Sequence, residues 1–144
     1  MPTITPARVR GRRARRAALA GVLAACVLPA TASAATVGIA ADGTLAYRGS
    51  DGEANSLSVR QLAEAIEVTD SSAGVKPTQL FNSFAQLCVP VSSTKVRCGH
   101  RPVRIKRIAA DLNDRNDVAS AINTHLPVAI GGGSGTDSFF AGAS

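Results

Sequence analysis

Short apolar runs separated by turn residues recur along the chain from residue 36 onwards. The runs at residues 36–39 and 44–48 flank an Asp-Gly pair, which between two such runs is a strong signal for a β-hairpin. The runs at residues 87–91 and 94–98 flank a Ser-Ser pair and predict a second hairpin. We therefore expect an all-β fold.

The run at residues 57–69 fits two kinds of element. Val59, Leu62 and Ile66 lie at helical spacing, whereas Ile66 and Val68 alternate as they would on a strand. Periodicity over so short a run leaves both interpretations open, and any helix in the chain is expected to be confined to the region around Val59 to Ile66.

The second half of the chain predicts a stack of short strands. Alternating apolar residues indicate a strand over residues 103–108, and a polar, turn-rich segment follows at 111–117. Short apolar runs at residues 118–122 and 128–130 are then separated by further turns. Such a sequence is typical of a β-solenoid, in which successive turns of the chain stack on one another.

The N-terminal region has the three parts of a secretory signal peptide. Six arginines precede residue 17, an apolar run covers residues 17–28, and Ala32, Ser33 and Ala34 form a small-x-small cleavage site. Residues 1–34 are therefore predicted to direct the protein out of the cytoplasm. No later segment is apolar enough to span a membrane.

A lipid-anchored form is the alternative to free secretion. Residues 23–26 resemble a bacterial lipoprotein box, in which Cys26 would carry the lipid. Val27 and Leu28 continue the apolar run beyond this cysteine, and the better cleavage site follows at Ala34. These features favour free secretion.

Charge does not indicate a nucleic-acid partner. From Ala35 onward the chain carries ten Lys or Arg and ten Asp or Glu, so the excess positive charge belongs to the leader. The basic stretch at residues 97–107 has no interleaved aromatic residues for base stacking. It is read as a solvated basic face, with a cell-surface or polyanion contact as the alternative; the residues concerned are Arg101, Arg104, Lys106 and Arg107.

Two cysteines, Cys88 and Cys98, remain after cleavage at the predicted site. An even pair in an oxidising compartment predicts a disulfide, which would staple the second hairpin. A two-cysteine metal site would need two further ligands, and His100 is the only nearby candidate.

The segment at residues 132–139 fits the repeat G-G-x-G-x-D-x-U, where U is a large apolar residue. Its glycines allow a left-handed backbone, and Asp137 supplies a carboxylate. Hard oxygen ligands of this kind suit Ca²⁺. Phe139 would start the next strand and point into the core. No arrangement of residues suggests catalysis, and we expect a protein that is not an enzyme.

In the order of these features the chain resembles the secreted actinobacterial calcium-binding proteins with hemolysin-type (RTX) nonapeptide repeats. The resemblance rests on the strand end at residues 68–70, the cysteine pair, the turn at 111–117 and the glycine repeat. It implies a β-rich module over residues 35–110 that leads into the start of a parallel β-roll or β-solenoid over 111–144. Asn113 and Arg115 stand where the family has glycine, and one nonapeptide is complete, so the chain looks like a truncated or degenerate member.

The resemblance also implies a ligand set for calcium, since the family shares each ion between stacked turns. Asp137 and the carbonyl groups of Gly133 and Gly135 would come from one turn, and Asp114 and Asp117 from the turn one coil away. So few carboxylates predict weak affinity. The alternative function is an extracellular interaction or surface module whose repeat tail is vestigial.

Overall fold

The residues that the computed structural model describes, 34–78, 87–99 and 104–142, form two β-sheets. They all belong to one unit of the chain, Thr31–Ser144. The leader predicted over residues 1–34 lies outside the described residues except for Ala34. The strands are β1 (Ala35–Ile39), β2 (Thr44–Arg48), β3 (Ser56–Gln61), β4 (Ala65–Asp70), β5 (Val75–Pro77), β6 (Cys88–Ser92), β7 (Lys95–Gly99), β8 (Arg107–Asp111), β9 (Val118–Asn123), β10 (Val128–Gly131) and β11 (Ser138–Ala141).

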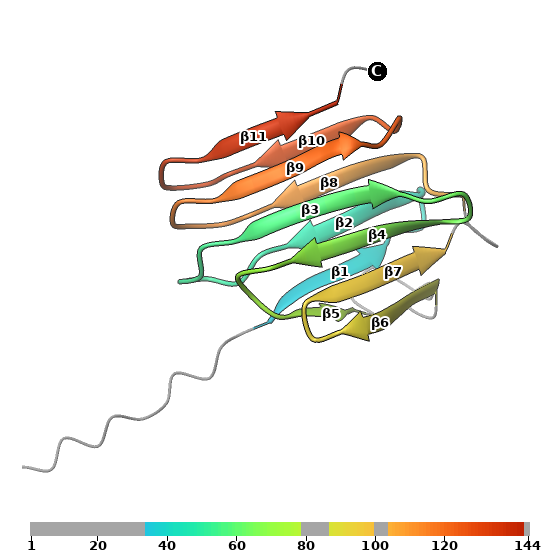
Figure 1. Ribbon diagram of the computed structural model, residues 1–144, viewed down its shortest axis with the longest axis horizontal. Coiled ribbons are helices and arrows are strands. Elements are labelled where there is room, and N and C mark those ends of the chain that lie inside the picture. Colours follow the sequence, from blue (N-terminus) through green and yellow to red (C-terminus); the bar gives the residue numbers. More distant parts are fainter. Residues whose placement is uncertain (1–33, 79–86, 100–103, 143–144) are drawn as a thin grey trace, which may run out of the picture. The chain divides into compact units, whose positions relative to one another are not determined.

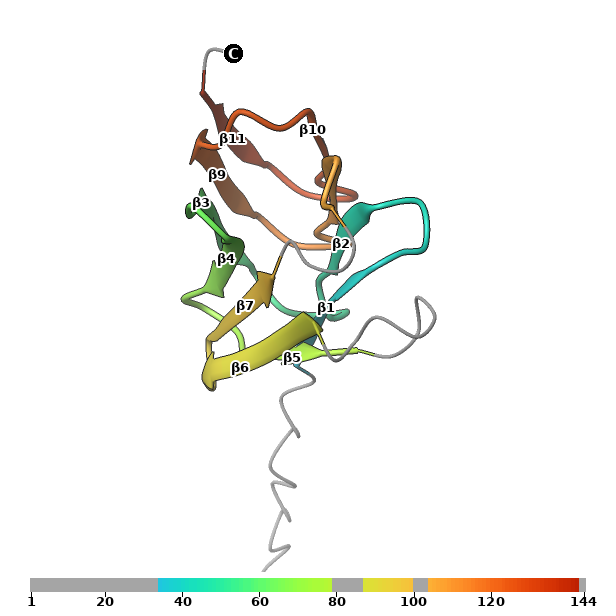
Figure 2. The same ribbon diagram turned by 90° about the vertical axis from the view of Figure 1, so that its right-hand side faces the viewer.

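The two sheets are mixed and lie face to face (Figures 1 and 2). One has the strand order β10-β8-β2-β1-β5 and the other β11-β9-β3-β4-β7-β6. Alternate side chains of both sheets meet in one hydrophobic core, which is built mainly from Val, Ile, Leu and Ala. Tyr47 is the one aromatic residue of this core in the described part of the chain. The predicted all-β class is confirmed.

Both predicted hairpins are present. Strands β1 and β2 pair antiparallel, with Val37 opposite Tyr47. Strands β6 and β7 also pair antiparallel, and Cys88 lies directly opposite Cys98. The two sulfur atoms are 2.02 Å apart, so this pair is compatible with the predicted disulfide.

The ambiguous run at residues 57–69 forms strands and not a helix. Strands β3 and β4 pair antiparallel with Val59 opposite Val68. Val59 and Val68 are buried and Arg60 is exposed, which is the period-two alternation of a sheet with one face in the core. The helical spacing of Val59 and Leu62 does not correspond to a helix, because Leu62 lies in the turn between the two strands.

The strand expected over residues 103–108 is wrong for its first part. Strand β8 begins at Arg107, and residues 104–106 are not in a strand. They pass the tip of the β1–β2 hairpin, where the amide of Lys106 donates to the carbonyl of Gly43 over 2.9 Å. A contact with a hairpin tip does not form a continuous ladder of hydrogen bonds. Strand β8 therefore begins at Arg107, where the chain first pairs with β2.

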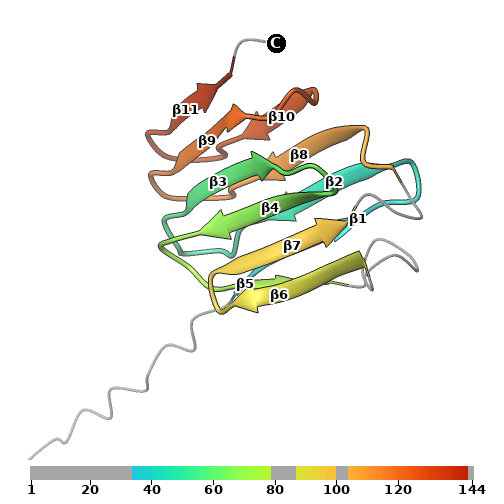
Figure 3. The same cartoon turned by 45° about the vertical axis from the view of Figure 1, so that its right-hand side comes forward.

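Strand β8 pairs parallel with β2 and β10, and β9 pairs parallel with β3 and β11. The chain therefore passes three times along the same route, as Figures 1 and 3 show. We call each pass a rung: the first is β2–β3, the second β8–β9 and the third β10–β11. The second and third rungs are twenty residues apart, since Val128 pairs with Ile108 and Ser138 with Val118.

Phe139 faces inward but is not enclosed as expected. It lies in register with Ala119, which lies in register with Leu57, and both of these are buried. Phe139 is 46% exposed, because the third rung is the last described one and no strand covers it.

Candidate functional site

The three rungs turn from one sheet to the other through polar segments that lie one above another, at residues 49–55, 112–117 and 132–137 (Figure 3). We call these segments the turn stack. The amide of Ser134 donates to the carbonyl of Asn113 over 3.0 Å, and the amide of Gly52 donates to Oδ1 of Asp114 over 2.6 Å. Asp114 and Ser134 also form a parallel bridge. The degenerate turn thus lies beside the complete glycine turn.

The middle turn keeps the backbone of a glycine turn without its glycines. Asn113 and Arg115 have φ values of 71° and 80°, and Gly133 above Asn113 has a φ of 77°. A side chain is excluded at Gly133 of the third turn, because a Cβ there would lie 1.5 Å from the Asn113 carbonyl oxygen. A non-glycine residue in the left-handed region costs about 1 kcal/mol, so stacking holds Arg115 in an unfavourable backbone conformation.

Two aspartates repeat one hydrogen bond up the stack. Oδ1 of Asp117 accepts from the backbone amide of Asn55 over 2.6 Å, and Oδ1 of Asp137 accepts from the amide of Asp117 over 3.0 Å. Each carboxylate therefore satisfies the amide at the same position of the preceding rung. This role explains a polar side chain at the point where each turn enters its second strand.

Asp117 and Glu53 are the two carboxylates of the turn stack that have a buried oxygen without a hydrogen-bond partner, and Asp117 is the more deeply buried of the two. It is 1% exposed, and its Oδ2 has no hydrogen-bond partner. Burial raises the pKa of this carboxyl above its ordinary value, and the charges of Asp137 and Asp114 raise it further, against hydrogen bonds from Asn55 that lower it. A buried carboxylate oxygen with a free lone pair is a group that a cation would stabilise.

A buried hydrogen-bond network supports the first turn. The Tyr47 hydroxyl lies 2.5 Å from Oδ2 of Asp70 and 3.0 Å from Oδ1 of Asn55. Asp70 is completely buried, and its Oδ1 accepts from the amides of Ser56, Ser72 and Ala73. Burial, followed by the hydrogen bond to Asp70, raises the pKa of Tyr47, so the phenol stays neutral and donates.

The sequence alone did not indicate Asn55 or Tyr47 as parts of this site. Asn55 lies 62 residues before Asp117 in the chain, and its side chain also donates to the carbonyl of Leu112 over 2.9 Å. An Asn in a turn before a strand is common for many reasons, so its presence in the sequence does not identify a site. Only the pairing of β3 with β9 brings Asn55 beside the acidic turn.

The predicted calcium ligands lie in neighbouring turns, and their carboxylates are already hydrogen bonded. Asp114, Asp117 and Asp137 each use Oδ1 to accept a backbone amide. Among residues 34–78, 87–99 and 104–142, no three His, Cys, Asp or Glu side chains are grouped as a metal site would require. A cation here would share these carboxylates with the backbone amides, and their second oxygens and nearby carbonyl groups are the ligands that no amide already occupies.

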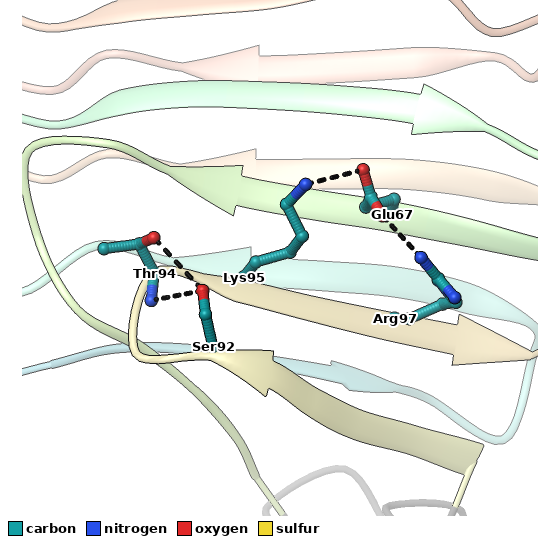
Figure 4. Close-up of polar contacts among 5 residues, drawn as sticks. All are labelled: Glu67, Ser92, Thr94, Lys95 and Arg97. Atoms are coloured by element: carbon teal, nitrogen blue, oxygen red, sulfur yellow. Dashed lines mark hydrogen bonds and ion pairs between the residues drawn. The ribbon is translucent and has the colours of Figure 1, made fainter.

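A separate charged cluster lies on the outer face of the six-stranded sheet (Figure 4). Glu67 of β4 accepts from Lys95 over 3.1 Å and from Arg97 over 2.9 Å, both in β7. The hydrogen bond from Arg97, followed by that from Lys95, holds the pKa of Glu67 below its ordinary value. In the adjoining β6–β7 turn the amide of Thr94 donates to Ser92 Oγ over 3.2 Å. The two ion pairs join strand β4 to strand β7.

The residues of the basic stretch differ in their surroundings. Arg107 donates from Nε to Thr44 Oγ1 over 2.7 Å and pairs with Asp42. Arg104 and Lys106 are exposed. Arg101, the fourth residue proposed for a polyanion contact, lies outside the described residues.

Comparisons with known proteins add no assignment to this geometry. Within the described part of the chain, no helix is both long and apolar enough to cross a membrane. No protein-family model matches the chain, and neither a curated protein nor a solved structure matches it.

Proposed function

We propose that this protein is a non-catalytic, secreted calcium-binding protein of the RTX-like group, and that its second and third rungs are the start of a parallel β-roll. One observation carries the proposal: Asp117 is buried in the turn stack with its Oδ2 unpartnered. A divalent cation at this oxygen would neutralise the buried charge and the repulsion from Asp137 and Asp114.

The backbone of the turn stack also supports this function. Positive φ values at residues 113 and 115 recur at residues 133 and 135, with Gly133 close to Asn113 in φ, and positive φ is the backbone that glycine-rich turns require. The candidate ligands are Asp117, Asp137 and Asp114 with the carbonyl groups of Gly133 and Gly135. Because one oxygen of each carboxylate already accepts an amide, we expect a dissociation constant of roughly 10⁻⁴ to 10⁻³ M, as in extracellular calcium modules.

Calcium titration of the purified protein, followed by thermal unfolding and isothermal calorimetry, tests the proposal. Calcium at ten times its dissociation constant should stabilise the fold by about 1.4 kcal/mol. Asp137→Asn is the sharpest variant, since an amide oxygen can still accept from the Asp117 amide while the charge is lost. This variant should fold and should lose most of the calcium response.

Asp42→Asn is the matched control, because Asp42 is an exposed carboxylate in the β1–β2 turn and not in the turn stack. It should keep the full response to calcium. If millimolar calcium leaves the wild-type protein unchanged, or if Asp137→Asn responds as the wild type does, this chain does not bind calcium through its repeat.

An extracellular interaction module with a vestigial repeat is the second candidate function. The observation in its favour is that Oδ1 of each aspartate in the second and third turns is used by a backbone amide, so the carboxylates have a structural role without any ion. In that case the titration gives no response. A binding assay with heparin as the probe, comparing the wild type with a double Arg104→Ser and Lys106→Ser variant, then tests the exposed basic residues.

A further inference from the structure

A hollow of about 460 Å³ lies at the ends of β3 and β9 that point away from the turn stack (Figure 1). We call it the β3–β9 hollow. Its volume is within the range of about 300–1,000 Å³ that is usual for small-molecule pockets. The calcium ligands proposed for the turn stack do not line it, so the hollow is a separate feature of the fold. The lining residues are Arg60, Gln61, Ile122, Asn123 and His125.

The ladder between β3 and β9 shifts its register at the hollow. Ser58 pairs with Ser120, but Arg60 pairs with Asn123, so β9 has one extra residue at this point. The extra residue interrupts the alternation of side chains, and Ile122 and Asn123 are both exposed. The bulge therefore places an apolar and an amide side chain together beside Arg60.

Gln61 holds the turn that carries His125. Oε1 of Gln61 accepts from the backbone amide of His125 over 3.0 Å and from Thr124 Oγ1 over 3.2 Å. Because a backbone amide can only donate, the side-chain oxygen of Gln61 faces it, and Nε2 is left as a donor. The amide of Leu126 donates in turn to Thr124 Oγ1 over 3.2 Å. This wall of the hollow is thus held in place by hydrogen bonds.

Arg60 forms no ion pair with any described residue. It lies directly opposite Glu67 in the β3–β4 ladder, but the oxygens of Glu67 accept from Lys95 and Arg97 instead. None of the residues that line the hollow is a carboxylate. The guanidinium of Arg60 therefore brings a fork of N–H donors to the hollow with no acidic side chain there to accept them.

We propose that the β3–β9 hollow binds a small organic carboxylate with a hydroxylated ring, such as a sugar acid. Arg60 pairs with the carboxylate, since a guanidinium can bind both of its oxygens at once. The side chains of Gln61, Asn123 and His125 donate to the ring hydroxyl groups. Ile122 is 56% exposed and provides an apolar contact for one face of the ring. An inorganic oxyanion would leave most of the hollow and this contact unused.

Titration of the purified protein with glucuronate, followed by two-dimensional NMR of the backbone amides in EDTA, tests the proposal. Glucuronate should shift the amides of residues 60–61 and 122–125 in a saturable way, with a millimolar dissociation constant. Glucose has a similar ring without the carboxylate, and acetate has the carboxylate without the ring. Both should bind about tenfold more weakly or less. EDTA excludes calcium, so a failure here leaves the proposed calcium site untouched.

Arg60→Gln should weaken glucuronate binding about tenfold or more, because the charged donor is lost from an exposed strand position. Arg104→Gln is the matched control, since Arg104 is also exposed but does not line the hollow. It should bind glucuronate as the wild type does. The dispersion of the NMR spectrum shows whether each variant folds. If Arg60→Gln does not fold, His125→Ala replaces it and should also weaken binding.

A wild type without saturable shifts overturns the proposal, and so do shifts centred on residues outside the hollow. Glucose or acetate that binds as tightly as glucuronate contradicts the ligand class. A folded Arg60→Gln protein that keeps the wild-type affinity, or His125→Ala in its place, also overturns the proposal.

Discussion

The carboxylate of Asp137 accepts a hydrogen bond from the backbone amide of Asp117 over 3.0 Å, twenty residues earlier in the chain. The same bond joins Asp117 to Asn55 in the rung below. The motif assigns Asp137 to metal binding, but in the structure its carboxylate links one rung to the next. Any ion must add to that role and cannot replace it.

Replacing Asp117 with Asn should stabilise the protein in the absence of calcium. An amide oxygen can still accept from Asn55, and the unsatisfied buried charge is removed, which we expect to be worth about 1 kcal/mol at neutral pH. Urea unfolding in EDTA measures the difference between the two proteins. The variant should also lose the calcium response, and a calcium-dependent Asp117→Asn protein would remove this residue from the site.

The same pair of proteins gives a pH dependence of known sign. Because the folded pKa of Asp117 is raised, the folded state binds this proton more readily than the unfolded state. The stability of the wild type relative to Asp117→Asn should therefore fall as pH rises from the ordinary pKa of Asp through the raised one. A relative stability that is flat across this range would show that the carboxyl is solvated.

Glu67 should contribute in the opposite direction. Its folded pKa is lowered by Arg97 and Lys95, so its contribution is present above the ordinary pKa of Glu and is lost as pH falls through the lowered value. Glu67→Gln should cost about 1 kcal/mol at neutral pH, with a smaller cost in high salt. A double-mutant cycle with Arg97→Gln isolates the pair, and a coupling energy near zero would contradict the assignment.

Arg115→Gly should stabilise the fold, although glycine usually destabilises. Arg115 has a φ of 80°, and relief of the left-handed conformation is worth about 1 kcal/mol. The matched control is Arg60→Gly in the interior of β3, which should destabilise by about 0.5–1 kcal/mol. Chemical denaturation measures both, and a loss of stability in Arg115→Gly would mean that its side chain contributes more than the strain costs.

Loss of both cysteines should destabilise the β6–β7 hairpin. Cys88 and Cys98 are direct partners across the two strands, and closing a loop of this length is worth roughly 3 kcal/mol or less on the chain-entropy model. Thermal unfolding of the double Cys→Ala variant measures the effect. Non-reducing peptide mapping of the exported protein should find the linked peptides, and two free thiols there would refute the disulfide.

Processing should leave an N-terminus near Ala35. Ala35 is the first residue of β1 and is buried, and its amide donates to the carbonyl of Gly74 over 2.8 Å, so cleavage after Ala34 leaves the strand complete. Mass spectrometry of protein from the culture medium measures this terminus. A lipid-modified terminus at Cys26 would establish the anchored alternative.

Much of the local structure was predictable because its causes are local. The β1–β2 and β6–β7 hairpins follow from alternating apolar residues around short turns, and the opposition of Cys88 and Cys98 follows from the second of them. The misplaced start of β8 has a non-local cause. Residues 104–106 are extended enough to bury Ile105, but they lie beside a hairpin tip and have no strand to pair with.

The all-β class, the main turns and the need for glycine in the last turn could be predicted from the sequence. These depend on side-chain alternation and backbone freedom within a few residues. The pairing of β3 with β9, which places Asn55 beside Asp117, became visible only in the folded chain, because neither of these distant segments carries a sequence signal that identifies its parallel partner. The structure also shows that Arg115 has a left-handed backbone. Local preference disfavours this conformation in a non-glycine residue, and the stacked turns hold it in place.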